Sequence, residues 1–474
     1  MQFTSSSKFK FVRHRVADAA QQRATVASVS SLFNARGVID APSFTVARPP
    51  VAKGGIAFAV RAHGTAQGWI AEATWHSQCE HLPFDGRYPH AASKRFATRS
   101  EAIDDALNRG LRQVQAQLGA RAISAAWAPK IEALRAWAVE AIFDVRLHDE
   151  ALPLRGVKVI DLFAGGLGGF GIGLASLGAR VELACEIDPQ ARAIYARNVR
   201  PAAMHADVCT LDGAKLCTDI LTVGLLCQAF SKAGKRRGFA DPALADAYRH
   251  TLRLLGEINA KVVIVECARQ FLTQELGKDA DTVRDALMLA GYRVQHRTLN
   301  AAGFGVAQSR ERSFIVATRL GLDVDDILGF TFPEEHAPTA IVEDILQPGI
   351  PHSIDAGHIA LDRVAPAGRS TKPERVGLID GHNWQGNRVY SPRAVGVTLT
   401  ASGGGKARFS GAYLIDGHAR GLTPREANRM QGMPEWAQHH AVAAQAMKQA
   451  GNAVAVPVAR ELGRQLAPIL NTRD

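Results

Sequence analysis

Residues 157–177 read VKVIDLFAGGLGGFGIGLASL, which is a β-branched run, a cluster of glycines and a second apolar segment. This order is typical of a buried strand, a tight glycine turn and a helix. Glycines let the backbone approach a cofactor closely, and the amides that start the helix can face it. An ordinary tight turn gives the same pattern, so the turn alone is a weak signal.

Short β-branched runs alternate with helical patterns through the region that follows. The runs occupy residues 157–163, 180–185, 220–226, 261–265 and 313–317. This alternation predicts an α/β fold with a doubly wound, mostly parallel sheet, whose ligands bind beyond the carboxyl ends of the strands. From residue 321 the alternation gives way to Pro, Gly, His and Asp, so we expect a small irregular domain over 321–420.

The first 150 residues have a different pattern. The first fifty lack sustained periodicity and end in Arg48-Pro49-Pro50, which predicts a loosely ordered arm. Apolar runs at 56–60 and 69–75 flank His63-Gly64-Thr65, which predicts a hairpin with its turn there.

Two helices are expected after the hairpin. Thr98 and Glu101 form a capping box before the periodic residues 102–118, and a second helical stretch covers 129–145. We therefore predict an N-terminal α+β accessory domain over 1–150. Its 19 Lys and Arg residues against 13 Asp and Glu are compatible with DNA contact, and a protein partner or dimerisation through this domain is an equal alternative.

Composition narrows the class of protein. The chain has 474 residues, 47% hydrophobic and 21% charged, with a net charge of +11 that favours a nucleic-acid partner. Its six cysteines form no CxxC pair, so we predict neither a metal site nor a disulfide framework. The longest nearly apolar run, 220–230, is too short to span a bilayer. We expect a cytoplasmic, nucleoid-associated protein with no membrane partner.

Acidic residues follow the successive strands. Glu186 and Asp188 come after the second strand, where a carboxylate holds ribose hydroxyls, and Asp207 ends a third strand and can accept from an adenine amine. Asp161 beside the glycine turn repels a pyrophosphate and attracts a cation. S-adenosyl-L-methionine therefore fits better than a dinucleotide. A helix N-cap is the structural alternative for Asp207.

A thiol and a carboxyl group come after the next two strands. Cys227 follows the run 220–226, and Glu266 ends the following one. A lone cysteine is more often inert packing, but a neighbouring carboxyl group suits attack on an electron-poor ring whose nitrogen must be protonated.

From Val157 onward the chain resembles the DNA cytosine-5 methyltransferases. The similarity rests on motifs in the family's order: DLFAG at 161–165, Glu186, Asp207, CQAFS at 227–231, QSRER at 308–312, LTPREANRMQGMP at 422–434 and GNAV at 451–454. The resemblance implies a catalytic domain over 156–320 plus 421–474, with target recognition over 321–420.

The resemblance also implies a mechanism. Cytosine flips out of double-stranded DNA, the Cys227 thiolate adds to C6, and C5 takes the methyl group of S-adenosyl-L-methionine. Glu266 binds and protonates N3, Arg312 holds O2, and Arg310 braces the acidic group.

Two groups of binding residues follow from the same resemblance. Those expected to bind the cofactor are Asp161, Phe163, Gly165, Gly168, Glu186, Ile187, Asp207, Asn452 and Val454. Those expected to contact DNA are Gln228, Ser231, Lys235, Arg236, Arg237, Gln308, Trp384 and Asn387.

The chain departs from the family pattern at three places. Leu226 stands where proline is usual, Cys267 where asparagine is usual, and the cofactor turn has Gly166-Leu167 in place of one residue. Three interpretations stay open: an active methyltransferase, which we favour; a variant enzyme with a modified S-adenosylmethionine; and an inactive DNA-binding or regulatory homologue. Restriction-modification, epigenetic and phage roles are equally compatible with the sequence.

Overall fold

The computed structural model describes residues 42, 44–48, 56–77, 85–88, 94–119, 127–225, 242–273, 277–321 and 329–471. The chain divides into two compact units, Met1–Ala151 and Leu152–Asp474. None of the helices in these ranges is long and apolar enough to cross a bilayer. The same ranges contain no cluster of three His, Cys, Asp or Glu side chains that could hold a metal.

The first unit contains a four-stranded antiparallel sheet and two helices. Its elements are β1 (Phe44–Arg48), β2 (Ile56–Thr65), β3 (Gly68–Ser77), β4 (Asp85–Tyr88), α1 (Arg99–Gly119) and α2 (Ala128–Leu147). Alternate residues of β2 are buried, and Phe58 stacks on Trp75 and packs against Trp137 of α2. Thr98 caps α1 by accepting a hydrogen bond from the Glu101 amide at 3.2 Å.

Two details of this unit correct the sequence analysis. Residues 44–48, predicted to belong to a loose arm, pair along their whole length with β2. The hairpin is present, but its strands pair as far as Thr65 and Gly68, so the turn lies at 66–67. His63 and Gly64 belong to β2, where they pair with Ile70 and Trp69. Pairing and packing with the neighbouring strand outweigh the local turn preference of these residues.

The second unit is built on a mixed sheet of seven strands among the described residues, in the order β10-β11-β9-β8-β5-β6-β7. These strands are β5 (Lys158–Leu162), β6 (Arg180–Cys185), β7 (Ala203–His205), β8 (Cys217–Gly224), β9 (Asn259–Ala268), β10 (Tyr292–Asn300) and β11 (Glu311–Arg319). The five strands β5 to β9 are parallel, which confirms the predicted mostly parallel sheet.

The other two strands differ from the expectation. β11 is antiparallel to β9, and β10, which the sequence analysis missed, is antiparallel to β11. β10 reads YRVQHRTLN, and its polar side chains suit an edge strand that lacks a continuous apolar run.

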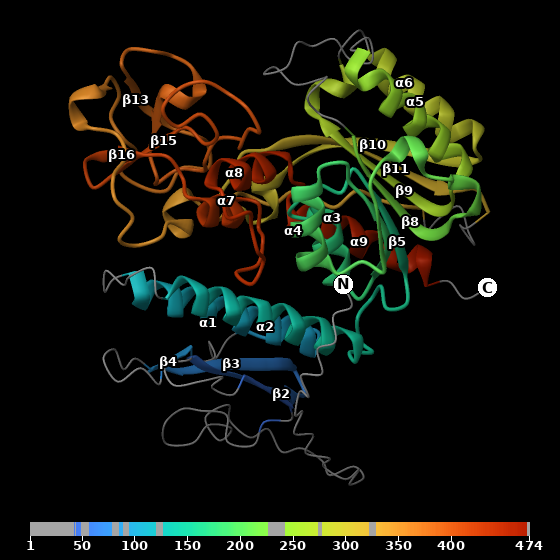
Figure 1. Cartoon of the computed structure of the whole chain (residues 1–474), viewed down its shortest axis with the longest axis horizontal. Coiled ribbons are helices and arrows are strands. Elements are labelled where there is room, and N and C mark those ends of the chain that lie inside the picture. Colours follow the sequence, from blue (N-terminus) through green and yellow to red (C-terminus); the bar gives the residue numbers. More distant parts are fainter. Residues whose placement is uncertain are drawn as a thin grey trace. The chain divides into compact units, whose positions relative to one another are not determined.

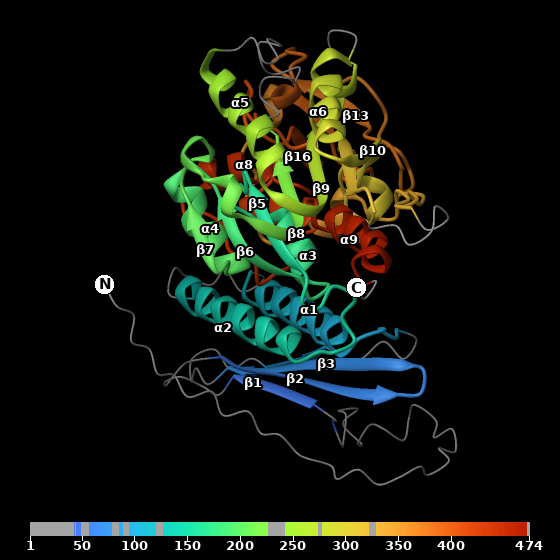
Figure 2. The same ribbon diagram turned by 90° about the vertical axis from the view of Figure 1, so that its right-hand side faces the viewer.

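Helices cover both faces of this sheet (Figures 1 and 2). On one face lie α3 (Gly169–Ala175), α4 (Pro189–Val199) and α9 (Val456–Leu470), and on the other α5 (Pro242–Glu257) and α6 (Lys278–Leu289). Leu254 of α5 and Val283 of α6 share a buried core with Val263 of β9. The C-terminal α9 packs against α3, so the last part of the chain completes the helical layer on this face of the sheet.

A smaller sheet follows β11. It contains β12 (Ile359–Leu361), β13 (Arg375–Ile379), β14 (Arg388–Tyr390), β15 (Ala412–Ile415) and β16 (His418–Arg420). Its strands are short, and it has its own core around Val376, Ile379 and Val389. The chain then returns to the main sheet through α7 (Pro424–Met430) and α8 (Ala443–Asn452), where Glu426 makes a buried ion pair with Arg420 at 2.7 Å.

Candidate functional site

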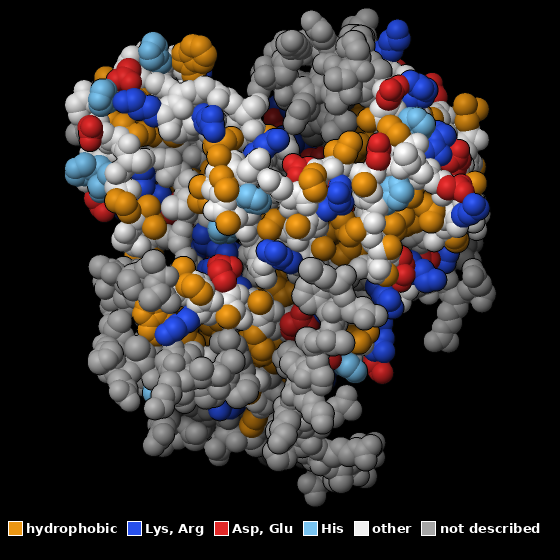
Figure 3. All heavy atoms as spheres, viewed as in Figure 1, with side chains coloured by type: hydrophobic (Ala, Val, Ile, Leu, Met, Phe, Trp, Pro, Cys, Tyr) orange, Lys and Arg blue, Asp and Glu red, His pale blue; other side chains and the backbone are white. Residues whose placement is uncertain are grey.

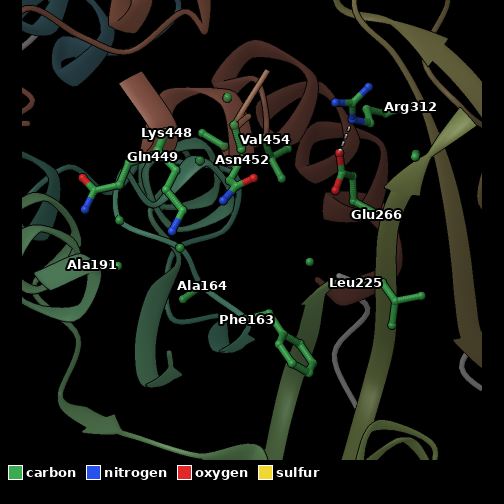
Figure 4. Close-up of a pocket in the computed structure, with 18 of the residues that line it drawn as sticks. Phe163, Ala164, Ala191, Leu225, Glu266, Arg312, Lys448, Gln449, Asn452 and Val454 are labelled. Carbon is green, nitrogen blue, oxygen red and sulfur yellow. Dashed lines mark ion pairs between the residues drawn. The ribbon is translucent and has the colours of Figure 1, made fainter. Parts of the chain in front are cut away.

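A cavity of about 1120 Å³ lies beyond the carboxyl ends of β5, β6, β8 and β9 (Figure 4). Its lining includes these predicted cofactor and catalytic residues: Asp161, Phe163, Gly165, Glu186, Ile187, Asp207, Asn452, Val454, Glu266, Arg310 and Arg312. The fold thus brings together side chains that are far apart in the chain. Gly168 lies behind the cavity wall, where a Cβ atom would meet Val199 at 2.5 Å.

The glycine turn has an unusual backbone. Phe163, Gly165 and Gly168 have φ angles of 54°, 67° and 72°, in the left-handed region that disfavours side chains. Holding a phenylalanine there costs on the order of 1–3 kcal/mol, which the surrounding structure must supply. The Ala164 amide donates to Cys185 O at 3.0 Å and ties the turn to β6.

Glu186 is fixed by two backbone amides. Its Oε2 accepts from the Gly165 amide and its Oε1 from the Asp188 amide, each at 2.9 Å. A carboxylate oxygen has a second lone pair, so both oxygens can still accept from a hydroxyl in the cavity. Asp188, proposed beside it, caps α4 through the Gln190 and Ala191 amides.

Asp207 follows β7, which ends at His205. Its Oδ1 accepts from the Cys209 amide at 2.9 Å and caps a short 3₁₀ turn. Asp207 therefore caps this turn, as the structural alternative predicted, and also lines the cavity. Its second oxygen, Oδ2, can accept a hydrogen bond from a ligand.

Asp161 is the buried acid of the glycine turn. Tyr195 OH donates to its Oδ2 at 2.7 Å, and Thr222 Oγ1 donates to its Oδ1 at 2.6 Å. Burial raises the pKa of Asp161 to about 6, although both hydrogen bonds act in the opposite direction.

This shift predicts a stability difference that depends on pH. In the folded protein this carboxyl group holds its proton up to about pH 6, whereas in the unfolded chain it ionises near its usual pKa of 3.8. The contribution of Asp161 to the free energy of unfolding is therefore complete below pH 3.8 and is lost as the pH rises through 6. Asp161→Asn does not titrate. Between pH 4 and 7.5 the free energy of unfolding of the variant, measured by urea denaturation, should rise by about 2 kcal/mol relative to that of wild type. The exposed Asp246→Asn serves as control, and equal changes in both variants would contradict the assignment.

Glu266 and Arg312 form the polar pair at the other end of the cavity. Arg312 Nε lies 3.3 Å from Glu266 Oε1, and the glutamate side chain is only 4% exposed. β9 and β11 pair so that Phe314 lies opposite Glu266, which places Arg312 on the same face as the glutamate. Figure 4 shows the two side chains pointing toward each other from adjacent strands.

The strand that precedes Cys227 in the sequence ends beside this pair. β8 ends at Gly224, not at residue 226 as expected, and the Leu225 amide donates to Glu266 O at 2.9 Å. Leu226, Cys227, Gln228, Ser231, Lys235, Arg236 and Arg237 lie outside the described residues. The chain therefore leaves the sheet next to Glu266, two residues before Cys227.

Cys267, the residue that replaces the usual asparagine, is 1% exposed and belongs to the hydrophobic core with Val223 and Phe271. Neighbouring residues of a strand face opposite sides, so Cys267 points away from the face of Glu266.

Arg310 has a different environment from the one expected. Its guanidinium donates to the carbonyls of Leu399, Gly451 and Ala453 at 2.9–3.2 Å and is 2% exposed. These bonds fix the end of α8 to the sheet. Glu266 forms an ion pair with Arg312, and the expected role of Arg310 in bracing the acidic group stays a prediction.

Two residues predicted to contact DNA are buried, and their side-chain amides bond to the protein backbone. Gln308 is fully buried, donates to Met430 O at 2.9 Å and accepts from the Leu399 amide at 2.8 Å. Asn387 is 5% exposed and donates to Ile379 O. Both amides satisfy backbone groups where irregular segments meet, a task that the sequence pattern does not distinguish from base contact.

Trp384 is 64% exposed and remains available for contact. On the face drawn in Figure 3, the Lys and Arg side chains of the described residues are interspersed with acidic and apolar ones.

Lys448 and Gln449 line the cavity as well and were missed by the sequence analysis. They come directly before Gly451-Asn452 on the last turn of α8. Their position close to the motif Gly451-Asn452 could have indicated that they line the same cavity.

Comparisons with known proteins agree with this geometry. Residues 157–467 match the family model described as C-5 cytosine-specific DNA methylase. The chain is 33% identical over 325 residues to Type II methyltransferase M.HhaI of Haemophilus parahaemolyticus, covering 67% of this chain and 96% of that protein. It is 30% identical to Type II methyltransferase M.NlaX of Neisseria lactamica, covering 66% and 97%. The structure of Entamoeba histolytica methyltransferase EhMeth has a similar fold, with TM-score 0.50, 15% identity and coverage of 65% and 97%.

Proposed function

The chain belongs to the C-5 cytosine-specific DNA methylases and is a DNA methyltransferase, and from this premise we propose that it methylates C5 of a flipped-out cytosine with S-adenosyl-L-methionine as donor. The observation that carries the proposal is that Glu186, Asp207 and the Glu266–Arg312 pair all line one cavity. Double-stranded DNA as substrate would place the enzyme at the nucleoid.

The donor set fits the proposed methyl donor. Glu186 offers both oxygens to ribose hydroxyls, Asp207 offers Oδ2 to the adenine amine, and Phe163 and Ile187 supply apolar surface for the ring. Small-molecule cavities are typically about 300–1,000 Å³, so the observed space also accommodates part of an inserted base. The donor, when bound, supplies a methyl group on a sulfonium.

The protein's own residues then divide the work. Cys227 adds its thiolate to C6 of the cytosine, and Glu266 donates a proton or hydrogen bond to N3, which places the electron pair at C5. Arg312 orients Glu266 and reaches O2, and its rigid, permanently charged guanidinium suits both tasks. Loss of the C5 proton restores the double bond and expels the thiolate. Arg310 is a positioning residue, because it fixes the segment that carries Asn452 and Val454.

DNA binding is assigned to the segments that follow β8 and the smaller sheet. We propose that Gln228, Ser231 and the basic residues Lys235, Arg236 and Arg237 contact the target strand, and that exposed Trp384 contacts bases. The names of the two relatives support placing this enzyme with the Type II methyltransferases.

Transfer of label tests the proposed reaction. Purified protein, duplex DNA and S-adenosyl-L-methionine tritiated in its methyl group should give labelled DNA, and mass spectrometry of the nucleosides should show 5-methylcytosine. A heavier C5 substituent in the DNA of cells that express the protein, with no label transferred from S-adenosyl-L-methionine in the purified reaction, would support the variant enzyme with a modified donor. DNA that binds without acquiring label would support an inactive homologue.

A further inference from the structure

Lys448 and Gln449 lie side by side at the end of α8, and Figure 4 shows both extending from the same side of the cavity. We propose that they bind the α-amino acid tail of the methyl donor, with Lys448 pairing with its carboxylate and Gln449 accepting from its ammonium. The inference rests on the proposed use of S-adenosyl-L-methionine and assigns recognition of the end remote from adenine.

The charges of the cavity single out Lys448. Four Lys or Arg side chains of the described residues line it: Arg269, Arg310, Arg312 and Lys448. Arg269 pairs with Glu311, Arg312 with Glu266, and Arg310 donates to three carbonyls. Lys448 is exposed and makes no ion pair with a described residue. A ligand carboxylate is repelled by Glu186 and Asp207 and needs such a cation.

Gln449 supplies the second, independent observation. Its side chain is 7% exposed, and its Oε1 is buried without a hydrogen-bond donor among the described residues. Leaving such an acceptor unsatisfied costs about 1–3 kcal/mol. Gln449 lines the cavity, and the terminal torsion of glutamine rotates readily, so Oε1 can turn to accept from an ammonium bound there.

The additional glycine of the cofactor turn makes room for this amide. A Cβ atom at Gly166 would lie 2.6 Å from Gln449 Cδ and 2.8 Å from Oε1. Both distances are too short for non-bonded contact, so Gly166→Ala should displace the amide. The longer turn and Gln449 thus form one feature of the site.

Three nucleosides separate the two roles when binding to the full chain is measured by calorimetry. S-adenosylhomocysteine has the whole tail, its decarboxylated analogue keeps only the amine, and 5′-methylthioadenosine has neither group. Lys448→Met should weaken S-adenosylhomocysteine about tenfold or more and leave the other two unchanged. Gln449→Met and Gly166→Ala should weaken both amine-bearing ligands and leave methylthioadenosine unchanged.

Matched controls are Lys372→Met and Gln465→Met, because neither residue lines the cavity. Equal weakening of all three ligands, or none, in the Lys448 and Gln449 variants overturns the inference and leaves the proposed function standing. Wild-type protein that binds none of the three contradicts the proposed function as well.

Discussion

Cys227→Ala is expected to lower methyl transfer to below roughly 10⁻⁴ of the wild-type rate, since no other group can form the bond to C6 that makes C5 nucleophilic. The substitution removes one sulfur atom from the segment after β8 and leaves in place the proposed cofactor residues that follow β5, β6 and β7. Binding of S-adenosylhomocysteine should therefore be retained. Transfer of tritium from labelled donor to duplex DNA measures the rate, and calorimetry measures the binding.

A matched control is available on the same strand. Cys217 is the first residue of β8 and is exposed at the opposite end from the cavity, so Cys217→Ala should keep full activity. Duplex DNA with 5-fluorocytosine at the target adds a direct test, because C5 then has no proton to lose and the enzyme stays attached. A denaturation-resistant complex that still forms with Cys227→Ala would disprove the role of this thiol.

The sequence was sufficient for the parts of the site that follow strand ends. Asp161, Glu186 and Glu266 come directly at or after buried runs, and parallel strands bring their carboxyl ends to one edge. Polar ties between distant segments could not be predicted in this way. Gln308 and Asn387 are polar residues of the kind that contact DNA, but the structure buries both side chains, and burial depends on which irregular segments meet.

The fold shows the same division. The strands β5, β6, β8 and β9 contain runs of buried apolar residues and were found by pattern, whereas the polar edge strand β10 was not. The hydrophobic pattern also could not predict the direction of β11. A strand buried on both faces has the same apolar run whether it pairs parallel or antiparallel with its neighbour. The predicted domain limits at 150, 320 and 420 stay predictions.

Glu266→Gln is expected to lower kcat by about 10² to 10⁴-fold with little change in DNA affinity. Glutamine has nearly the same size and keeps a carbonyl oxygen for Arg312, so the β9–β11 pairing is preserved. It cannot give up a proton to N3 of the cytosine, however, and the negative charge that develops on the ring after thiolate addition is then left in a poorly solvated site. Single-turnover kinetics with tritiated donor report the chemical step directly.

Glu257→Gln is the matched control, because Glu257 is also paired with an arginine, Arg253, but does not line the cavity. This control separates the two roles of a carboxyl group, pairing with an arginine and donating a proton. Both variants weaken an ion pair with arginine, but only Glu266→Gln removes the proposed proton donor to N3. If both variants lose the same activity, Glu266 acts through packing and the proton comes from elsewhere. If only Glu266→Gln is slow and it still binds DNA and S-adenosylhomocysteine like wild type, the defect lies in the chemistry at N3, next to the point where Leu225 joins Glu266 and the chain leads to Cys227.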